Sequence, residues 1–174
     1  MVTLGEPTLG MMSSPFGSIS EEDVIQVLND FFQNVQGIPC VHCCSNMDWP
    51  QLMKSHTQVI NFDAYQYADK MALYPKELAA FFEKGGMLAW GIVPVSPEIL
   101  PSESKEQLVE RLEEGIRRLT ERGIDQQKLL DRSFVTPCCT TATLSKEQAE
   151  QVFHFTQNIS GEMRRRYFPE EVSH

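Results

Sequence analysis

Residues 75–95, PKELAAFFEKGGMLAWGIVPV, decide the fold class. The first part is typical of a short helix, and the glycine pair at its end is a common helix stop. The second part, 87–95, is an almost entirely apolar run of strand length. A helix that leads directly into such a strand is the repeating unit of α/β proteins, so we predict a parallel sheet with helical cover.

The same alternation extends along the whole chain in both directions. Amphipathic helices are predicted after Ser20, Ser104 and Ser145, each of which is placed to cap a helix, and the last two are followed by Gln107 and Gln148 as capping boxes. A shorter helix is predicted around WPQLMKS. The predicted strands are 2–7, 37–44, 58–65, 87–95 and 133–139. The 174 residues therefore form one domain of about five strand-helix units.

Two architectures suit parallel strands with regular helical crossovers: an open doubly wound sheet and part of a barrel. No glycine-rich phosphate-binding loop follows any of the strands, which removes the support for a dinucleotide-binding fold. A complete (β/α)8 barrel needs eight units and about 250 residues. We therefore predict an α/β fold that corresponds to a partial (β/α)8 TIM barrel.

Composition limits the partners and the compartment. The net charge is -9, which argues against binding to nucleic acid or to an anionic membrane, because both require clustered Lys and Arg. No apolar run approaches the ~20 residues of a membrane span, and the N-terminus lacks the pattern of a signal peptide. The expected location is the cytoplasm. In that reducing compartment the five cysteines are expected to act as thiols or metal ligands rather than as disulfides.

Polar side chains gather at the predicted ends of the strands: Glu6, His42, Cys44, Asp63 and Cys139. In (β/α) barrels the active site lies at this edge of the sheet. Because side chains alternate along a strand, His42 and Cys44 point to the same side. Imidazole and thiolate are zinc ligands, and a catalytic zinc site commonly has three protein ligands and one open position. We predict zinc binding by His42, Cys44 and Cys139, with Asp63 as a fourth ligand or as a residue that orients one.

The other three cysteines have a simpler interpretation. Buried free cysteine is common as a small apolar side chain. Cys40 is expected in the core, and Cys43 and Cys138 are expected to face the helices. The same alternation places Val135 and Cys139 on one face of the fifth strand.

Four ordered segments, CVHCC, VINFDAY, GGMLAWGIVPV and LLDRSFVTPCCTTATLSKEQAEQV, resemble the C-terminal half of the cobalamin-independent methionine synthase-like proteins. These belong to the uroporphyrinogen decarboxylase and methionine synthase barrel superfamily. The resemblance implies a zinc site formed by His42 and Cys44, an acidic residue that corresponds to Asp63, and Cys139 two residues after a proline. It also implies that Glu6, in LGEPTL, lies beside the substrate amino acid.

From this resemblance we expect a zinc-dependent methyltransferase, similar to 5-methyltetrahydropteroyltriglutamate-homocysteine S-methyltransferase of methionine biosynthesis. The acceptor would be a homocysteine-like thiol, and the donor a methyl-folate or a methyl-corrinoid. The sequence departs from the family pattern at two positions. Gly5 stands where an aspartate would bind the amino group of the acceptor, and Thr140 replaces the glycine after the last cysteine.

Two alternatives remain. The first is a non-catalytic zinc-binding half-barrel subunit that needs a partner chain, and the second is a decarboxylase-like barrel without metal. The chain begins at about the fourth strand of the family barrel, so five strands are expected to leave unpaired edges and an apolar inner face, with Ile60, Phe62 or Leu88 meeting water. We therefore expect a homodimer, or association with the missing N-terminal half, and little homocysteine methylation by the chain alone.

Overall fold

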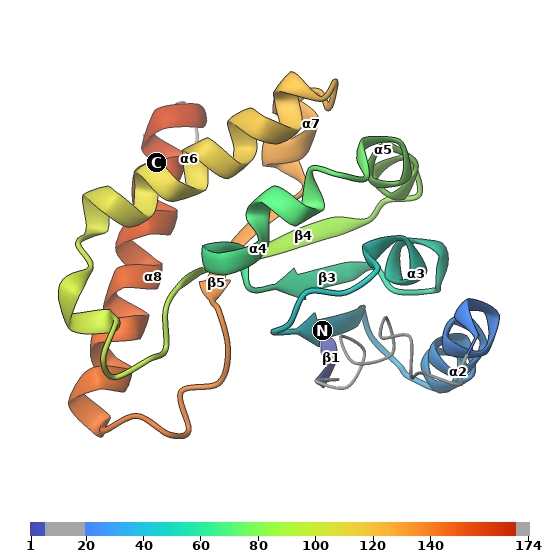
Figure 1. Ribbon diagram of the computed structural model, residues 1–174, viewed down its shortest axis with the longest axis horizontal. Coiled ribbons are helices and arrows are strands. Elements are labelled where there is room, and N and C mark those ends of the chain that lie inside the picture. The colour runs from blue at the N-terminus through green and yellow to red at the C-terminus, as the bar shows by residue number, and fades with distance from the viewer. Residues whose placement is uncertain (6–19, 170–174) are drawn as a thin grey trace.

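The computed structural model describes residues 1–5 and 20–169 and contains one five-stranded sheet (Figure 1). All neighbouring strands are parallel and follow the chain in the order β1-β2-β3-β4-β5. The strands are β1 (Val2–Gly5), β2 (Pro39–Cys43), β3 (Val59–Phe62), β4 (Met87–Val93) and β5 (Ser133–Pro137). The predicted α/β class with about five parallel strands is confirmed. Residues 6 and 7 of the first predicted strand lie outside the described residues.

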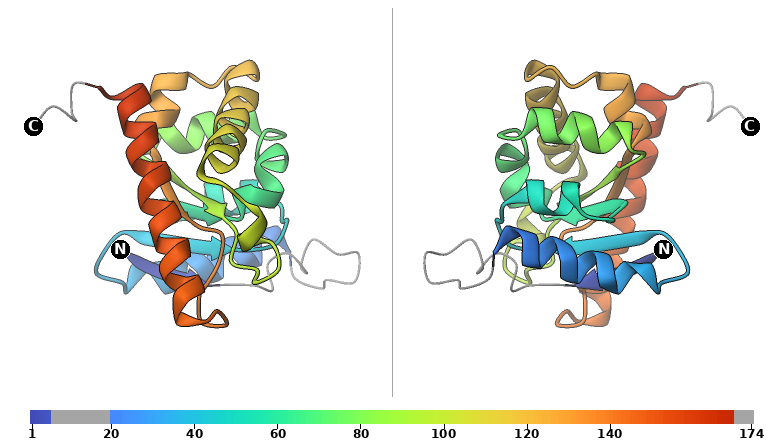
Figure 2. Two further views of the ribbon diagram at one scale, coloured as in Figure 1. Left: turned by 90° about the vertical axis from the view of Figure 1, so that its left-hand side faces the viewer. Right: turned by 90° about the vertical axis from the view of Figure 1, so that its right-hand side faces the viewer.

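Helices fill the connections between the strands. They are α2 (Glu21–Gln33), α3 (Trp49–Lys54), α4 (Ala64–Met71), α5 (Pro75–Glu83), the 3-10 turn η1 (Leu100–Ser102), α6 (Lys105–Glu121), α7 (Gln126–Asp131) and α8 (Lys146–Tyr167). None of these described helices has the length and apolar character needed to cross a membrane. Figure 2 shows α8 along one side of the molecule and α2 along the opposite side.

The helix starts follow from the capping chemistry of the sequence. Ser20, Ser104 and Ser145 each accept a hydrogen bond from a backbone N–H in the first turn, and each forms a full capping box. The box residues predicted for α6 and α8, Gln107 and Gln148, are confirmed. The predicted strand 58–65 ends earlier, at Phe62, because the Asp63 side chain caps α4.

The two faces of the sheet are covered differently. One face packs against all of the longer helices and forms the main core; we call it the helix-covered face, and its strand residues include Val41, Cys43, Ile60, Phe62, Leu88 and Trp90. The opposite face has a small cluster of Cys40, Val59 and Ala89, to which no helical residue of the described chain belongs. A doubly wound sheet has helices on both faces, whereas a barrel has them only outside. The sheet is therefore consistent with part of an α/β barrel.

The expectation that Ile60, Phe62 or Leu88 meets water is wrong. All three are fully buried on the helix-covered face, at 0% exposure. The reason is the register, which aligns Ile60 with Val41 and Leu88, and Phe62 with Cys43 and Trp90, in rows under the helices. The opposite face instead carries smaller side chains.

Candidate metal centre

Three predicted ligands come together at the carboxyl edge of the sheet. His42 lies on β2, Cys44 directly follows that strand, and Cys139 follows the last residue of β5 by two positions. The strands are parallel, so their carboxyl ends meet at the same edge although 95 residues separate Cys44 from Cys139 (139 − 44). The fold thereby supplies the proximity that sequence spacing does not.

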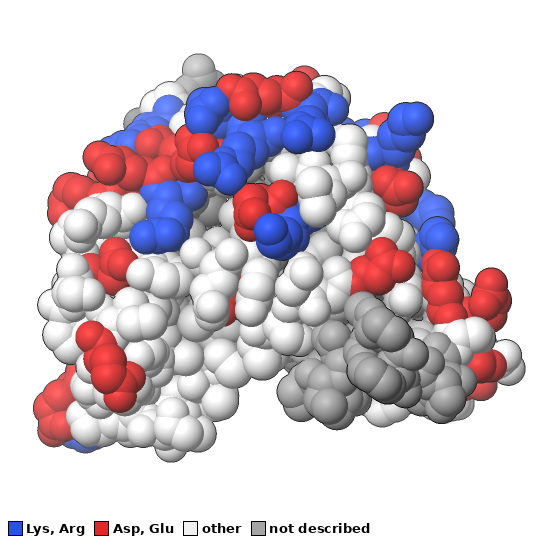
Figure 3. Space-filling model, in the orientation of Figure 1, with Lys and Arg blue, Asp and Glu red and all other residues white. Residues whose placement is uncertain are grey.

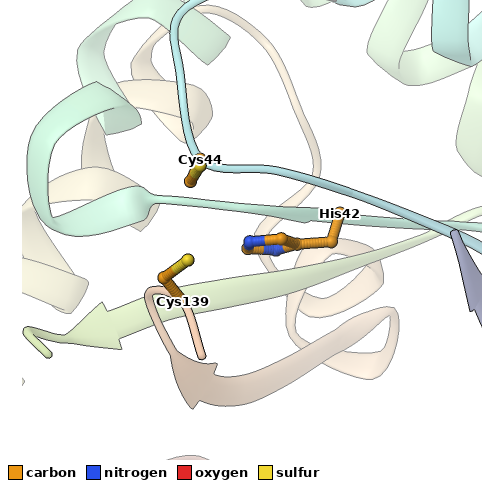
Figure 4. Close-up of side chains that lie close together, drawn as sticks. All are labelled: His42, Cys44 and Cys139. Atoms are coloured by element: carbon orange, nitrogen blue, oxygen red, sulfur yellow. The ribbon is translucent and has the colours of Figure 1, made fainter. Parts of the chain in front are cut away.

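The ligand atoms of these three residues all lie within 4.8 Å of one another. Figure 4 shows the imidazole of His42 extended toward the two sulfur atoms, with Cys44 and Cys139 approaching from different loops. All three side chains are half-buried. One nitrogen and two sulfurs at this separation can hold a metal ion, and they match the donor types of a zinc site.

Only one of the two ring nitrogens of His42 has a hydrogen-bond partner. Its Nδ1 lies 2.6 Å from Oδ1 of Asn61 on β3, whereas its Nε2 is buried and has no hydrogen-bond partner. A buried polar atom without a partner is costly, and its presence in a site points to a missing ion or water. A metal ion between Nε2 and the two sulfurs would satisfy this atom, so the residues fit the group that the sequence implies.

The electrostatics of the two thiols also favour a cation. Burial raises the pKa of Cys44, and the neighbouring Cys139 raises it further, because each thiolate would repel the other. A bound cation would offset both penalties, since it would stabilise the two thiolates and so favour deprotonation of the thiols.

Three cysteines take no part in the group. Cys43 belongs to the main core, as predicted, and its Sγ lies 3.4 Å from the carbonyl oxygen of Ser45. Cys40 is buried in the small cluster of the opposite face. Cys138 is also buried, and burial together with the nearby Asp63 raises its pKa to about 12. Burial also raises the pKa of Cys40, so the thiols of Cys40 and Cys138 are held in the protonated form.

The shared face predicted for Val135 and Cys139 is wrong. Val135 packs against the main core, whereas Cys139 lies with His42. Alternation fails here because β5 ends at Pro137, after an irregularity in its pairing between Gly91 and Val93 of β4. Beyond Pro137 the chain is no longer a strand, so its side chains do not follow the alternation.

Asp63 lies next to this edge but outside the group of mutually close ligand atoms. Its Oδ1 accepts a hydrogen bond of 3.0 Å from the backbone N–H of Gln66, and its Oδ2 accepts one of 2.7 Å from the Gln66 side chain. Burial raises the pKa of this carboxyl group, against the opposing effect of these hydrogen bonds and of His42. Asp63 is thus the cap of α4, and its coordination of a metal stays a prediction.

The predicted substrate residue Glu6 lies outside the described residues. Gly5, which directly precedes it, is the last residue of β1 and pairs with His42 in the sheet register. Gly5 therefore lies next to His42, one of the metal-ligand candidates.

Sequence reasoning missed Asn61, which contacts His42 directly. One signal was available: Asn61 is a carboxamide within the otherwise apolar strand VINF, which the register of the sheet then pairs with His42. Asparagine is depleted in strands, so its position there invited a functional interpretation.

One cavity lies apart from this centre. It has a volume of about 380 Å³ and lies between β5 and the helices α6, α7 and α8. Its lining includes Trp90, Phe134, Met163, Arg164 and Phe168, and none of the three metal-ligand candidates.

Comparison of the sequence with protein-family models and with curated proteins finds no match.

Proposed function

We propose that this protein is a zinc protein in which His42, Cys44 and Cys139 hold a metal that activates a thiol substrate for methyl transfer. The observation that carries the proposal is that His42, whose buried Nε2 has no hydrogen-bond partner, offers a ring nitrogen within 4.8 Å of both sulfurs. The resemblance to the cobalamin-independent methionine synthases supports the reaction type.

The donor set selects the metal. Two thiolates and one imidazole suit zinc, whereas magnesium and calcium require oxygen ligands. Three protein ligands leave one position of a tetrahedral site for a substrate atom. Zinc bound here would supply a Lewis acid that holds a substrate thiol in the thiolate form at neutral pH.

The residues of the chain would perform the remaining tasks. His42 would provide a neutral nitrogen lone pair, and Cys44 and Cys139 would provide sulfurs from two different loops. Gly5, paired with His42, leaves room beside the centre, since an added Cβ there would meet nothing within 4 Å. We propose a homocysteine-like acceptor and a methyl-folate or methyl-corrinoid donor; no described residue selects between these donors.

A second function, a zinc-binding subunit that needs a partner, is favoured by the shape of the sheet. No described strand pairs with the outer edge of β1 or of β5. Val2 on β1 is 36% exposed and Phe134 on β5 is 47% exposed. In Figure 3 the charged side chains gather mainly over the upper part of the surface, and much of the described surface in the lower middle of the view is uncharged. We propose that a second copy or a complementary half-barrel covers these edges.

Metal analysis tests the shared premise of both functions. The purified protein should contain about one zinc per chain. Cys44→Ser and Cys139→Ser should each lose it, while their neighbours, Cys43→Ser and Cys138→Ser, serve as matched controls and should retain it. Stoichiometric zinc in both ligand variants would reject the centre.

Three measurements then separate the functions. Zinc X-ray absorption of the loaded protein should show two sulfur ligands, and a third after addition of homocysteine if the centre binds a thiol. We expect little or no methionine formation by the chain alone, and light scattering over a dilution series should show a dimer or larger assembly. Robust turnover by a monomer would contradict the subunit proposal, and an unchanged sulfur count would contradict thiol activation.

A further inference from the structure

We propose that Asn61 is the positioning residue of the metal centre, because its carboxamide fixes His42 in the tautomer that presents the Nε2 lone pair to the two thiols. Its effect on metal affinity rests on the zinc function proposed above, whereas its effect on the His42 tautomer does not. No feature of the sequence motif assigns this role.

The orientation of the carboxamide follows from its neighbours. Nδ2 of Asn61 donates hydrogen bonds to the backbone carbonyl oxygen of Ala89, at 3.1 Å, and to Oγ1 of Thr136, at 2.9 Å. A carbonyl oxygen can only accept, so the NH₂ group must face Ala89. A flipped amide would place two oxygen atoms against each other. Oδ1 therefore faces His42.

The orientation of Asn61 in turn determines the proton position on His42. A carboxamide oxygen can only accept, and Nδ1 of His42 lies 2.6 Å from it, so Nδ1 carries the hydrogen. In the neutral ring the remaining nitrogen, Nε2, then has a free lone pair. This is the buried atom without a partner, and a lone pair is what a metal ion requires.

The same side chain also ties the strands of the site together. His42, Asn61, Ala89 and Thr136 belong to β2, β3, β4 and β5 in turn. One carboxamide therefore links the strand that carries His42 to the strand that leads to Cys139, three residues after Thr136. This link ties the strand of His42 to the strand that precedes Cys139.

The tautomer can be measured without metal. In reduced, zinc-free protein with ¹⁵N-labelled histidine at pH 8, well above the ordinary histidine pKa of about 6.5, long-range proton–nitrogen correlation spectra distinguish a protonated from a bare ring nitrogen. The His42→Gln variant identifies the signals among the four histidines. We expect a protonated Nδ1 and a bare Nε2; a protonated Nε2 would overturn the proposal, whether or not the protein binds zinc.

Three variants separate the two effects of Asn61. Asn61→Leu has similar size but no hydrogen bonds, and it should mix the tautomers and weaken zinc binding by roughly 10- to 100-fold in competition with a chelator. Asn61→Asp retains an acceptor for Nδ1–H, so it should preserve the tautomer while it loses both anchoring donors. Thr136→Val, which keeps the Ala89 contact, is the matched control and should lose the least affinity.

Folding is checked by circular dichroism and thermal melting of each variant. Wild-type zinc affinity and an unchanged tautomer in a folded Asn61→Leu protein would overturn the role. If Asn61→Leu does not fold, the spectra of the wild type and of Asn61→Asp still test the role of Asn61. A mixed or reversed His42 tautomer in either of these two proteins would contradict that role. Absence of zinc from the wild type would instead reject the metal centre.

Discussion

The helix-covered face and the opposite face of the sheet are formed by the same five strands but differ in side-chain size and polarity. Phe62 and Trp90 on the helix-covered face lie with ring centroids 5.3 Å apart, and Phe62 also contacts Trp49. The opposite face carries a cluster of Cys40, Val59 and Ala89, and beyond it the hydrogen-bonded His42 and Asn61. Neighbouring residues thus serve different purposes: the helix-covered face stabilises the fold, and the opposite face forms the centre.

The largest expected effect is a loss of stability on the helix-covered face. Phe62→Ala should lower the free energy of unfolding by about 3–5 kcal/mol, because it leaves a cavity among large aromatic rings. Val59→Ala, on the opposite face of the same strand, removes two methyl groups and should cost only about 1.6 kcal/mol. Urea denaturation of the two variants measures both values. Equal losses would show that the two faces contribute alike.

A substitution at Gly91, where β4 lies close to the end of β3 and to the turn after Pro137, should affect both stability and zinc binding. A Cβ added to Gly91 would lie 2.6 Å from the carbonyl oxygen of Phe62 and 2.7 Å from Cα of Cys138, and backbone atoms cannot move aside easily. Gly91→Ala should therefore cost about 1–3 kcal/mol and weaken zinc binding by displacing the turn that carries Cys139.

Gly5→Ala is the matched control for Gly91→Ala, because an added Cβ at Gly5 meets nothing within 4 Å. Denaturation and chelator competition should find this variant close to the wild type. Unchanged stability and zinc binding in Gly91→Ala would show that β4 and the turn after Pro137 can accommodate the added methyl group without moving Cys139.

The adjacent residues Cys43 and Cys44 should differ in which property their substitution affects, and the expected change in stability is smaller than at Phe62 or Gly91. Cys43→Ala removes a fully buried thiol from the core and should cost about 1 kcal/mol while zinc binding persists. Cys44→Ala should abolish zinc binding with little loss of stability in the metal-free protein.

Iodoacetamide labelling followed by mass spectrometry provides a second test. Cys44 and Cys139 should react in the metal-free protein and be protected by zinc, and rapid labelling of Cys40 or Cys43 would contradict their burial.

The smallest effect is expected on the exposed side of α8, away from both faces. Hydrogen bonds from Arg165 and Arg166 lower the pKa of Glu162 to about 2. A lowered pKa stabilises the fold above the unfolded-state pKa near 4.3, and this contribution is lost as the pH falls through about 2. Glu162→Gln should lower the melting temperature by about one degree at pH 7, because exposed ion pairs contribute little. The difference in melting temperature between this variant and the wild type should vanish near pH 2. If it persisted there, the ionised Glu162 carboxylate would not be its cause.

Much of the secondary structure could be predicted because its signals are local. Ser104 with Gln107 and Ser145 with Gln148 satisfy helix N-termini by contacts three residues apart. The apolar runs around Ile60 and Leu88 have strand length, and their alternation with helices requires parallel pairing. The three ligand candidates were also identified, because parallel strands bring their carboxyl ends to one edge whatever the distance along the chain.

The sequence by itself determined the order and direction of the strands, the capped starts of the helices, and the residue types that can meet at the carboxyl edge. Only the tertiary structure decided which face the helices cover, because Ile60, Phe62 and Leu88 are apolar whichever way they point. It also decided that Cys139, beyond the end of β5, turns toward His42, and that Asn61 joins His42 to Ala89 and Thr136. These contacts depend on the register between strands that are 19 to 75 residues apart, and backbone alternation along one strand carries no information about that register.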